Sequence, residues 1–237
     1  MHAKVKKSVV TEPLKTNSPT AHKLSLGRPT KQSLNADTKA LLIRSGLEHL
    51  TEYGFTASGI DAVLKRAGVP KGSFYYYFSS KEAFGKELIA SYDAFFGKKL
   101  DAHLLDERFE PLQRLERYVL DAEQTMEKYS FRRGCLIGNL GQEVDSLPES
   151  YRSILSDVFF GWQQRVQACL YLAQWHGQLG ADADCRQLAE YFWIGWEGAV
   201  SRAKLTRSVQ PLRCFFKCFM EGLSISKCVG VNSNQIN

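Results

Sequence analysis

Apolar residues recur at intervals of three and four positions along most of the chain after residue 36, the spacing of one face of an α-helix. The first such segment starts at Asp37 and Thr38, which can cap a helix, and it runs to Tyr53. Gly54 comes next, and glycine ends helices readily because it adopts a positive φ. The pattern therefore predicts a first helix over residues 37–53.

Two short helices and one long helix are predicted next. Ser58 can cap a helix over 59–67, and Gly68 then breaks it. A second short helix follows over 71–78, and the long helix runs from Lys81 to about residue 103. The first two of these, joined by a short turn that contains glycine, have the geometry of a helix-turn-helix unit.

The second half of the chain lacks the period-two alternation that marks a strand. It predicts further helices over 110–129, 133–146, 149–177, 183–207 and 210–225. The fold class is therefore all-α, with about nine helices. No stretch approaches the ~18 to 20 uninterrupted apolar residues of a membrane span, so we expect no membrane partner.

The charge of the chain is concentrated at its start. Residues 1–36 carry seven basic residues and one acidic residue, which accounts for the whole net charge of +6. This segment is poor in apolar residues and is interpreted as a disordered basic arm. Such an arm on a neutral body favours a polyanionic partner, with Arg28 and Lys31 suited to a DNA minor groove or to phosphates. A solubilising tail is the alternative.

The aromatic run over 74–78 carries the most specific signal. Phe74 and Phe78, four positions apart, form an inward stripe, whereas three consecutive tyrosines cannot all be buried on one helix. We therefore expect Tyr75, Tyr76 and Tyr77 to offer hydroxyls to phosphates and rings to thymine methyl groups of DNA. A purely structural aromatic cluster would account for the phenylalanines but not for the tyrosines.

Polar and small residues flank that run in a way that suits DNA. Lys71 and Lys81 can neutralise phosphates on either side of it. Gly72 allows the backbone to approach DNA closely, and Ser73 supplies a small hydrogen-bond donor at the helix start.

The six cysteines all lie in the second half and form no CxxC pair, so we interpret them as reduced thiols of a cytoplasmic protein. Cys135 differs from the others because Arg132 and Arg133 precede it at a predicted helix start. Positive charge and the helix dipole both favour the thiolate, which predicts a lowered pKa and a reactive thiol. Simple packing of this thiol is the alternative.

No catalytic constellation, metal site or cofactor motif is predicted, so the chain is not expected to be an enzyme. None of the five histidines lies near Cys135 in the sequence, which disfavours a cysteine-dependent enzyme. A non-DNA adaptor that uses the helix-turn-helix only for packing is a second rival, and the basic arm disfavours it.

The stretch GFTASGIDAVLKRAGVPKGSFYYYFSSKEAF resembles the amino-terminal DNA-binding domain of the TetR family of bacterial transcriptional repressors. The resemblance covers residues 37–95. It implies a homodimer on the double-stranded DNA of a palindromic operator, with half-sites roughly 34–36 Å apart. It places Ser58 and Lys81 on phosphates, and Lys71, Gly72, Ser73, Tyr75 and Tyr76 at the groove. Tyr77 stands where many members have histidine.

The resemblance also implies a C-terminal domain that binds a small-molecule effector of unknown identity and dimerises through its last two helices. The expected dimer contacts are Leu188, Phe192, Trp196, Ala199, Leu212, Phe216 and Phe219. The expected effector chamber is lined by Tyr118, Met126, Tyr129, Leu136, Trp162, Trp175, Trp193 and Trp196. An ordinary core role is the alternative for each set.

The segment RRGCLIGNLGQEV resembles the NemR and AcuR branch of the family, whose members respond to reactive electrophiles, oxidants or acrylate-like compounds. A lysine associated with the cysteine in that branch is matched by Lys204. The predicted function is thus an effector- or electrophile-responsive repressor, with a transcriptional activator as the alternative. The predicted domains are the arm (1–36), a DNA-binding domain (37–96), an effector-binding and dimerisation domain (97–228) and a flexible tail (229–237).

Overall fold

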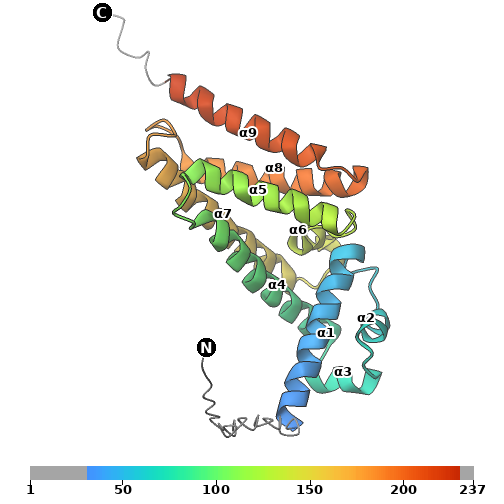
Figure 1. Cartoon of the computed structure of the whole chain (residues 1–237). Helices are drawn as coiled ribbons and strands as arrows, with labels where there is room; N and C mark the ends of the chain where they lie inside the picture. The colour runs from blue at the N-terminus through green and yellow to red at the C-terminus, as the bar shows by residue number, and fades with distance from the viewer. Residues whose placement is uncertain (1–30, 230–237) are drawn as a thin grey trace, which may run out of the picture.

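Helices make up almost all of the regular structure in residues 31–229, the part of the chain that we describe from a computed structural model; side chains are described for 35–223. Within this part there is no strand, which confirms the all-α prediction. The elements, shown in Figure 1, are α1 (Lys31–Tyr53), α2 (Ile60–Ala67), α3 (Lys71–Tyr77), α4 (Lys81–Leu104), α5 (Pro111–Lys128), α6 (Leu136–Gln142), the 3-10 turn η1 (Val144–Ser146), α7 (Ser150–Trp175), α8 (Cys185–Thr206) and α9 (Gln210–Val229).

Helix α1 differs from its prediction at one end. It ends at Tyr53 as expected, and Gly54 has a φ of 82°. It begins at Lys31 rather than at Asp37, so the last residues assigned to the basic arm belong to the helix. Apolar periodicity could not reveal this turn, because a short polar helical extension carries no apolar stripe.

The N-cap of α2 is Gly59 and not Ser58. The Ser58 hydroxyl donates a hydrogen bond to the carbonyl of Gly54, and the side chain is buried. The cap prediction was therefore wrong, because the loop after α1 turns this serine inward to satisfy the end of α1.

The helix-turn-helix unit packs around three phenylalanines. Phe74 and Phe78 are buried as predicted, and both contact Phe84 of α4 with ring centroids 5.2 and 4.7 Å away. Edge-on contacts of this kind add to the burial of the rings. Ser80 caps α4 by accepting a hydrogen bond from the Ala83 amide, which fixes where the long helix begins.

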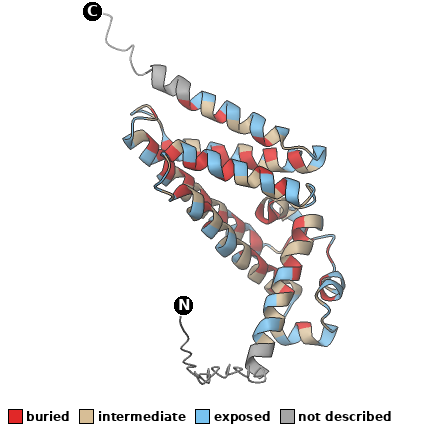
Figure 2. Ribbon diagram, viewed as in Figure 1, coloured by how far each residue is buried: buried red, intermediate tan, exposed pale blue. Residues whose placement is uncertain are grey.

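Helix α4 leads from the helix-turn-helix unit into a bundle formed by α5 to α9 (Figure 1). Helix α8 lies between α7 and α9, which it contacts most extensively, and α9 forms the outer layer. Buried residues gather on the facing sides of these helices, whereas α2 and α3 are largely exposed (Figure 2). Among the described residues, no helix combines the length and apolar character needed to cross a membrane.

A chain of aromatic rings forms the centre of the bundle. The ring centroids of Trp162 of α7 and Trp193 of α8 lie 5.2 Å apart, and the ring of Phe96 of α4 contacts both. The Trp162 indole also donates a hydrogen bond of 2.8 Å to Asp93. Both tryptophans are almost completely buried, so they are core residues that link α4, α7 and α8.

Candidate functional site

The exposed face of α3 carries the predicted recognition tyrosines. Tyr75 is 56% exposed and Tyr76 is 70% exposed, while Tyr77 is partly buried against the core. Gly72 faces open space, with nothing near the position of a Cβ. The helix therefore presents two phenols and an unobstructed backbone on the side opposite Phe74, which is the arrangement that major-groove contact requires.

The two lysines beside α3 have different environments. Lys71 is exposed and forms an ion pair of 3.0 Å with Asp61, whose hydrogen bond raises the pKa of the lysine. Lys81 instead donates to the carbonyl of Phe55 and lies 4.5 Å above that ring. In this structure Lys81 therefore stabilises the loop after α1, which differs from the expected contact with phosphate.

Three other predicted DNA contacts are not on this face or cannot be placed. Ser58 is only 3% exposed and its hydroxyl is occupied by Gly54, so a phosphate contact is a wrong prediction for this residue. Arg28 lies outside the described residues, and Lys31 begins α1 with a side chain outside the described set.

A cavity of about 460 Å³ lies between α1, α4, α5, α8 and the segment that leads into α6. Its walls are mostly aromatic and apolar, with several charged residues among them. Its lining includes Arg44, Leu47, Glu48, Thr51, Tyr92, Phe95, Phe96, Lys99, Tyr118, Ala122, Met126, Lys128, Tyr129, Arg133, Gly134, Cys135, Trp196, Glu197 and Val200. This size and composition are typical of small-molecule sites.

The cavity brings together some of the predicted effector residues and excludes others. Tyr118, Met126, Tyr129, Cys135 and Trp196 line it. The prediction was wrong for the other lining residues, which lie in the packed core or on the surface. Trp162, Trp193 and Leu136 are buried in packing contacts, and Trp175 is 87% exposed at the end of α7.

Cys135 lies at the N-cap of α6 as expected, but its thiol is not activated. Burial first, and then the Glu197 carboxylate, raise the pKa of this thiol well above its usual value. These effects outweigh the amide of Gly138, which donates to Sγ over 3.4 Å. The prediction of a lowered pKa was therefore wrong.

The arginines that motivated that prediction point elsewhere. Arg132 is exposed, and Arg133 lies 4.2 Å from the Tyr129 ring while its guanidinium pairs with acidic residues of α1. Sequence proximity placed these charges beside Cys135, but neither arginine is among the groups that shift the pKa of its thiol.

Glu197 is one of the ionisable residues of the cavity that sequence reasoning missed. Burial raises the pKa of its carboxyl from 4.5 to about 7, although a hydrogen bond with Cys135 opposes this change. Its Oε1 is buried and has no hydrogen-bond partner among the described residues. A Cβ at Gly138 would collide with this carboxyl, so the glycine allows α6 to approach it. The available signal was a glutamate inside the apolar stripe of α8, directly after Trp196.

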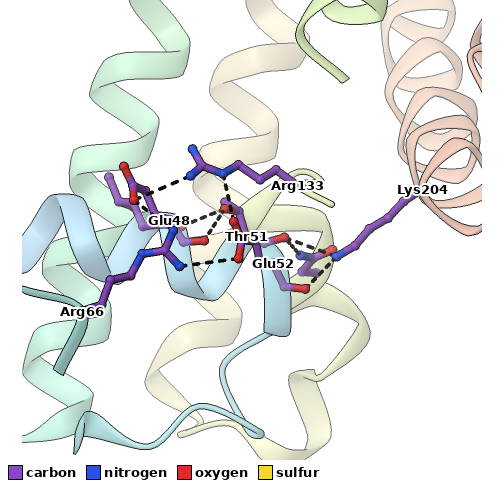
Figure 3. Close-up of polar contacts among 8 residues, drawn as sticks. Glu48, Thr51, Glu52, Arg66, Arg133 and Lys204 are labelled. Carbon is purple, nitrogen blue, oxygen red and sulfur yellow. Dashed lines mark hydrogen bonds and ion pairs between the residues drawn. The ribbon is translucent and has the colours of Figure 1, made fainter. Parts of the chain in front are cut away.

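The cavity shares its wall with a polar junction between the C-terminal bundle and the end of α1 (Figure 3). Lys204 of α8 reaches across and donates to the carbonyls of Thr51 and Glu52, over 3.3 and 3.1 Å. The Thr51 carbonyl also accepts from the Gly134 amide and from the Asn139 side chain. Lys204 therefore satisfies the C-terminal carbonyls of α1, where a cation is favoured by the helix dipole.

The structure gives no hydrogen bond between Lys204 and Cys135. Burial lowers the pKa of the Lys204 ammonium, and Glu52 partly opposes this change. The association of this lysine with the cysteine, implied by the family resemblance, is therefore replaced by a contact between domains.

Two arginines extend the junction to α2. Arg133 contacts Glu48 and Glu52 at 3.6 and 3.3 Å, and Arg66 of α2 contacts the same two carboxylates at 3.1 and 3.5 Å. Figure 3 shows the acidic pair of α1 held between the two guanidinium groups. Burial alone would raise the pKa of Glu52, but the hydrogen bonds from Arg133 and Arg66 lower it. A wall residue of the cavity is thus linked electrostatically to the helix-turn-helix unit.

A second contact between domains involves Glu143, which precedes η1. Its carboxylate accepts hydrogen bonds from the amides of Phe55 and Thr56, the latter at 2.7 Å. Nothing in the sequence indicated this role, because the contact depends on a loop from a distant part of the chain.

The predicted dimer residues lie mostly inside the protomer. Five of them are buried where α8 packs on α9 and on the core, namely Phe192, Trp196, Ala199, Leu212 and Phe219. Gly195 faces the Phe215 ring so closely that a Cβ would collide with it. The stripe identified in the sequence therefore belongs to packing within one chain; Leu188 and Phe216 are partly exposed.

A different face of α8 is exposed and largely uncharged. Tyr191, Ile194, Gly198, Ser201 and Leu205 are all exposed and are spaced three or four residues apart. Tyr191, Ile194 and Leu205 are 54%, 68% and 76% exposed. Small residues between large ones on one face permit close approach of another helix.

Comparisons with known proteins match both the helix-turn-helix part and the C-terminal bundle of the chain. The family model described as "Bacterial regulatory proteins, tetR family" matches residues 42–88, and "Tetracyclin repressor-like, C-terminal domain" matches residues 111–219. The transcriptional regulator AcuR of Cereibacter sphaeroides is 51% identical over 178 residues, 75% of this chain and 81% of that protein. The HTH-type transcriptional repressor NemR of Escherichia coli K12 is 31% identical over 176 residues, 74% and 88% of the two chains.

A solved structure gives the same result. The crystal structure of regulatory protein TetR from Rhodobacter sphaeroides is 49% identical, with a TM-score of 0.77. The match covers 78% of this chain and 97% of that one.

Proposed function

The chain belongs to the TetR family of bacterial transcriptional regulators and carries its DNA-binding helix-turn-helix, and we propose that it is a repressor released from a palindromic operator by a small-molecule effector. The observation that carries the proposal is the combination of exposed Tyr75 and Tyr76 on α3 with a cavity that shares wall residues with α1. The relative NemR is named a transcriptional repressor, which supports repression rather than activation for this chain.

In the proposed complex, α3 enters the major groove of DNA. Tyr75 and Tyr76 contact phosphates or base edges, and Lys71 adds a cation beside them. Ser73 and Gly72 lie at the start of α3, where the backbone can approach the DNA. The tyrosines supply hydrogen bonds and ring contacts, so sequence preference depends on them more than on the lysine.

The proposed operator-binding form is a homodimer, which supplies two copies of α3. The exposed face of α8 with Tyr191, Ile194, Gly198 and Leu205 supports pairing with the same face of a second copy. A twofold interface brings one surface onto itself, so a single self-complementary stripe is sufficient. The two α3 helices would then read half-sites roughly 34–36 Å apart.

The effector proposed for the cavity is a small, mainly apolar molecule with at least one hydrogen-bonding group. The rings of Phe96, Tyr118 and Trp196 supply apolar surface, and Glu197 offers a buried oxygen without a partner in the described chain. Because the pKa of the Cys135 thiol is raised, the proposed effector binds noncovalently.

Release from DNA is proposed to follow from the shared wall. An effector that displaces Arg133 or the segment at Gly134 would loosen the contacts that hold the end of α1. Because Arg66 of α2 pairs with the same end of α1, the helix-turn-helix would be loosened as well. By linkage, the effector weakens DNA binding only as far as it prefers the altered arrangement over the DNA-bound one.

Selection from random duplex DNA tests the proposal. The wild-type chain is expected to enrich a palindromic duplex and to retain it in a gel shift. Tyr76→Ala is expected to lose at least about tenfold in affinity, because several groove contacts disappear together. Tyr171→Ala is a matched control, since Tyr171 is 50% exposed on α7. Failure to enrich any duplex, or equal binding by Tyr76→Ala and wild type, would overturn the proposal.

A further inference from the structure

Asn35, near the start of α1, contacts two tyrosines of α3. Asn35 Nδ2 donates a hydrogen bond of 3.2 Å to the phenol oxygen of Tyr76. The phenol of Tyr77 donates to Asn35 Oδ1 over 3.4 Å. The two rings meet edge to face, with centroids 4.9 Å apart. One amide thus joins both phenols, across about forty residues of sequence.

We propose that Asn35 is a positioning residue for DNA recognition, which holds the Tyr76 phenol in place and leaves its hydroxyl hydrogen free to donate toward DNA. A phenol has one hydrogen to donate and can also accept. The Tyr76 oxygen accepts from Asn35, so its own hydrogen remains available on the exposed side. Tyr77 donates its phenol hydrogen to Asn35 and therefore helps to hold the Asn35 amide in place.

The chemistry of the partner follows from that donor. The Tyr76 hydroxyl is expected to contact an acceptor, either a phosphate oxygen or a purine N7, guanine O6 or thymine O4 in the major groove. The amino groups of adenine and cytosine are donors themselves, so they cannot accept this hydrogen.

Asn35 also reduces the conformational cost of binding. Tyr76 is 70% exposed, so without a partner its side chain would sample several rotamers and lose that freedom on the DNA. A side chain held in the bound position before contact spends less free energy on ordering. The effect depends on the exact position of the phenol, so it should change binding to a preferred duplex more than binding to random DNA.

A double-mutant cycle tests this inference, which rests on the proposed function. The variants are Asn35→Ala, Tyr76→Phe and their combination, and affinity is measured on the duplex selected by the wild-type chain and on a random duplex. Asn35→Ala is expected to weaken binding to the selected duplex about three- to tenfold, the worth of one hydrogen bond. Binding to the random duplex should change less than about twofold.

Coupling between the two residues is the decisive readout. In the Tyr76→Phe background, Asn35→Ala is expected to have little further effect, because the phenol it positions is gone. Tyr75→Phe is the matched control, since no contact joins Tyr75 to Asn35 among those described, and its effect should add to that of Asn35→Ala.

Any one of three results would overturn the inference. Additive effects of Asn35→Ala and Tyr76→Phe would mean that Asn35 acts independently of the phenol. Equal losses on both duplexes would mean that it contributes only general affinity or folding. If the wild-type chain selects a duplex and Asn35→Ala binds it equally well, this inference fails while the proposed function stands; if the wild-type chain selects none, the proposed function itself fails.

Discussion

Replacing Glu197 by glutamine should change how the stability of the protein depends on pH. Burial raises the pKa of this carboxyl from 4.5 to about 7, and glutamine has the same shape without a titrating proton. The unfolded chain loses the Glu197 proton near pH 4.5 and the folded chain near pH 7. Between these values the folded state binds more protons, so the free energy of unfolding falls as the pH rises.

The size of the effect follows from the change in pKa. A rise from 4.5 to about 7 corresponds to about 3 kcal/mol of destabilisation above pH 7. Below pH 4.5 this contribution disappears, because both states are protonated. Between about pH 5.5 and pH 8 the contribution of Glu197 alone should lower the free energy of unfolding by about 2 kcal/mol.

Urea denaturation of the wild type and of Glu197→Gln at a fixed protomer concentration measures this contribution. The difference in free energy of unfolding between the two proteins should move by about 2 kcal/mol in favour of the variant as the pH rises over that range. Glu190→Gln, at an exposed position of the same helix, should show no such pH-dependent difference. Parallel pH profiles for the wild type and Glu197→Gln would refute the reasoning.

Three further predictions concern the thiol, the domain junction and the core. Cys135 should react with iodoacetamide at least about tenfold more slowly in the folded chain than in urea, because burial raises its pKa; faster labelling in the folded chain would contradict this. Lys204→Met should cost about 1–2 kcal/mol of unfolding free energy in urea, because the Thr51 and Glu52 carbonyls of α1 each lose a hydrogen bond from the Lys204 ammonium; Lys217→Met, at an exposed position of α9, should cost less than about 0.5 kcal/mol. Phe74→Ala should cost about 3–5 kcal/mol in the same assay, and a cost below about 1 kcal/mol would show that this ring is not central to the core.

Helix positions and the inward faces of helices could be predicted from the sequence because they depend on local signals. Gly54 adopts the positive φ expected of it, and Phe74 and Phe78 are buried as their spacing indicated. The same local reasoning failed for Ser58. A serine before a helix usually caps it, but here the carbonyl of Gly54 competes for its hydroxyl and turns the side chain inward.

The partner against which an apolar helix face packs was much harder to predict. Phe192 and Phe219 lie on apolar faces in the sequence, and an apolar face is the same whether it meets its own chain or a second copy. Only the packing of α8 on α9 shows that these rings are used within the protomer. The exposed face with Ile194 contains glycine and serine, so its amphipathic signal is weak.

The environment of Cys135 depended on residues that the sequence places far away. Arg132 and Arg133 are its neighbours in the chain, yet Glu197 is its neighbour in space. A pKa is set by burial and by charges within a few ångströms, so adjacent residues in a loop predict it poorly. The junction made by Lys204 has the same origin, since it joins positions separated by about 150 residues.

Hydroxyl-radical footprinting on the duplex selected by the wild-type chain tests the central claim most directly. A dimer that places two α3 helices in successive major grooves predicts two protected stretches on one face of the DNA, roughly 34–36 Å apart. Tyr76→Ala should remove both together. A single protected stretch, or a footprint that Tyr76→Ala leaves unchanged, would contradict the account.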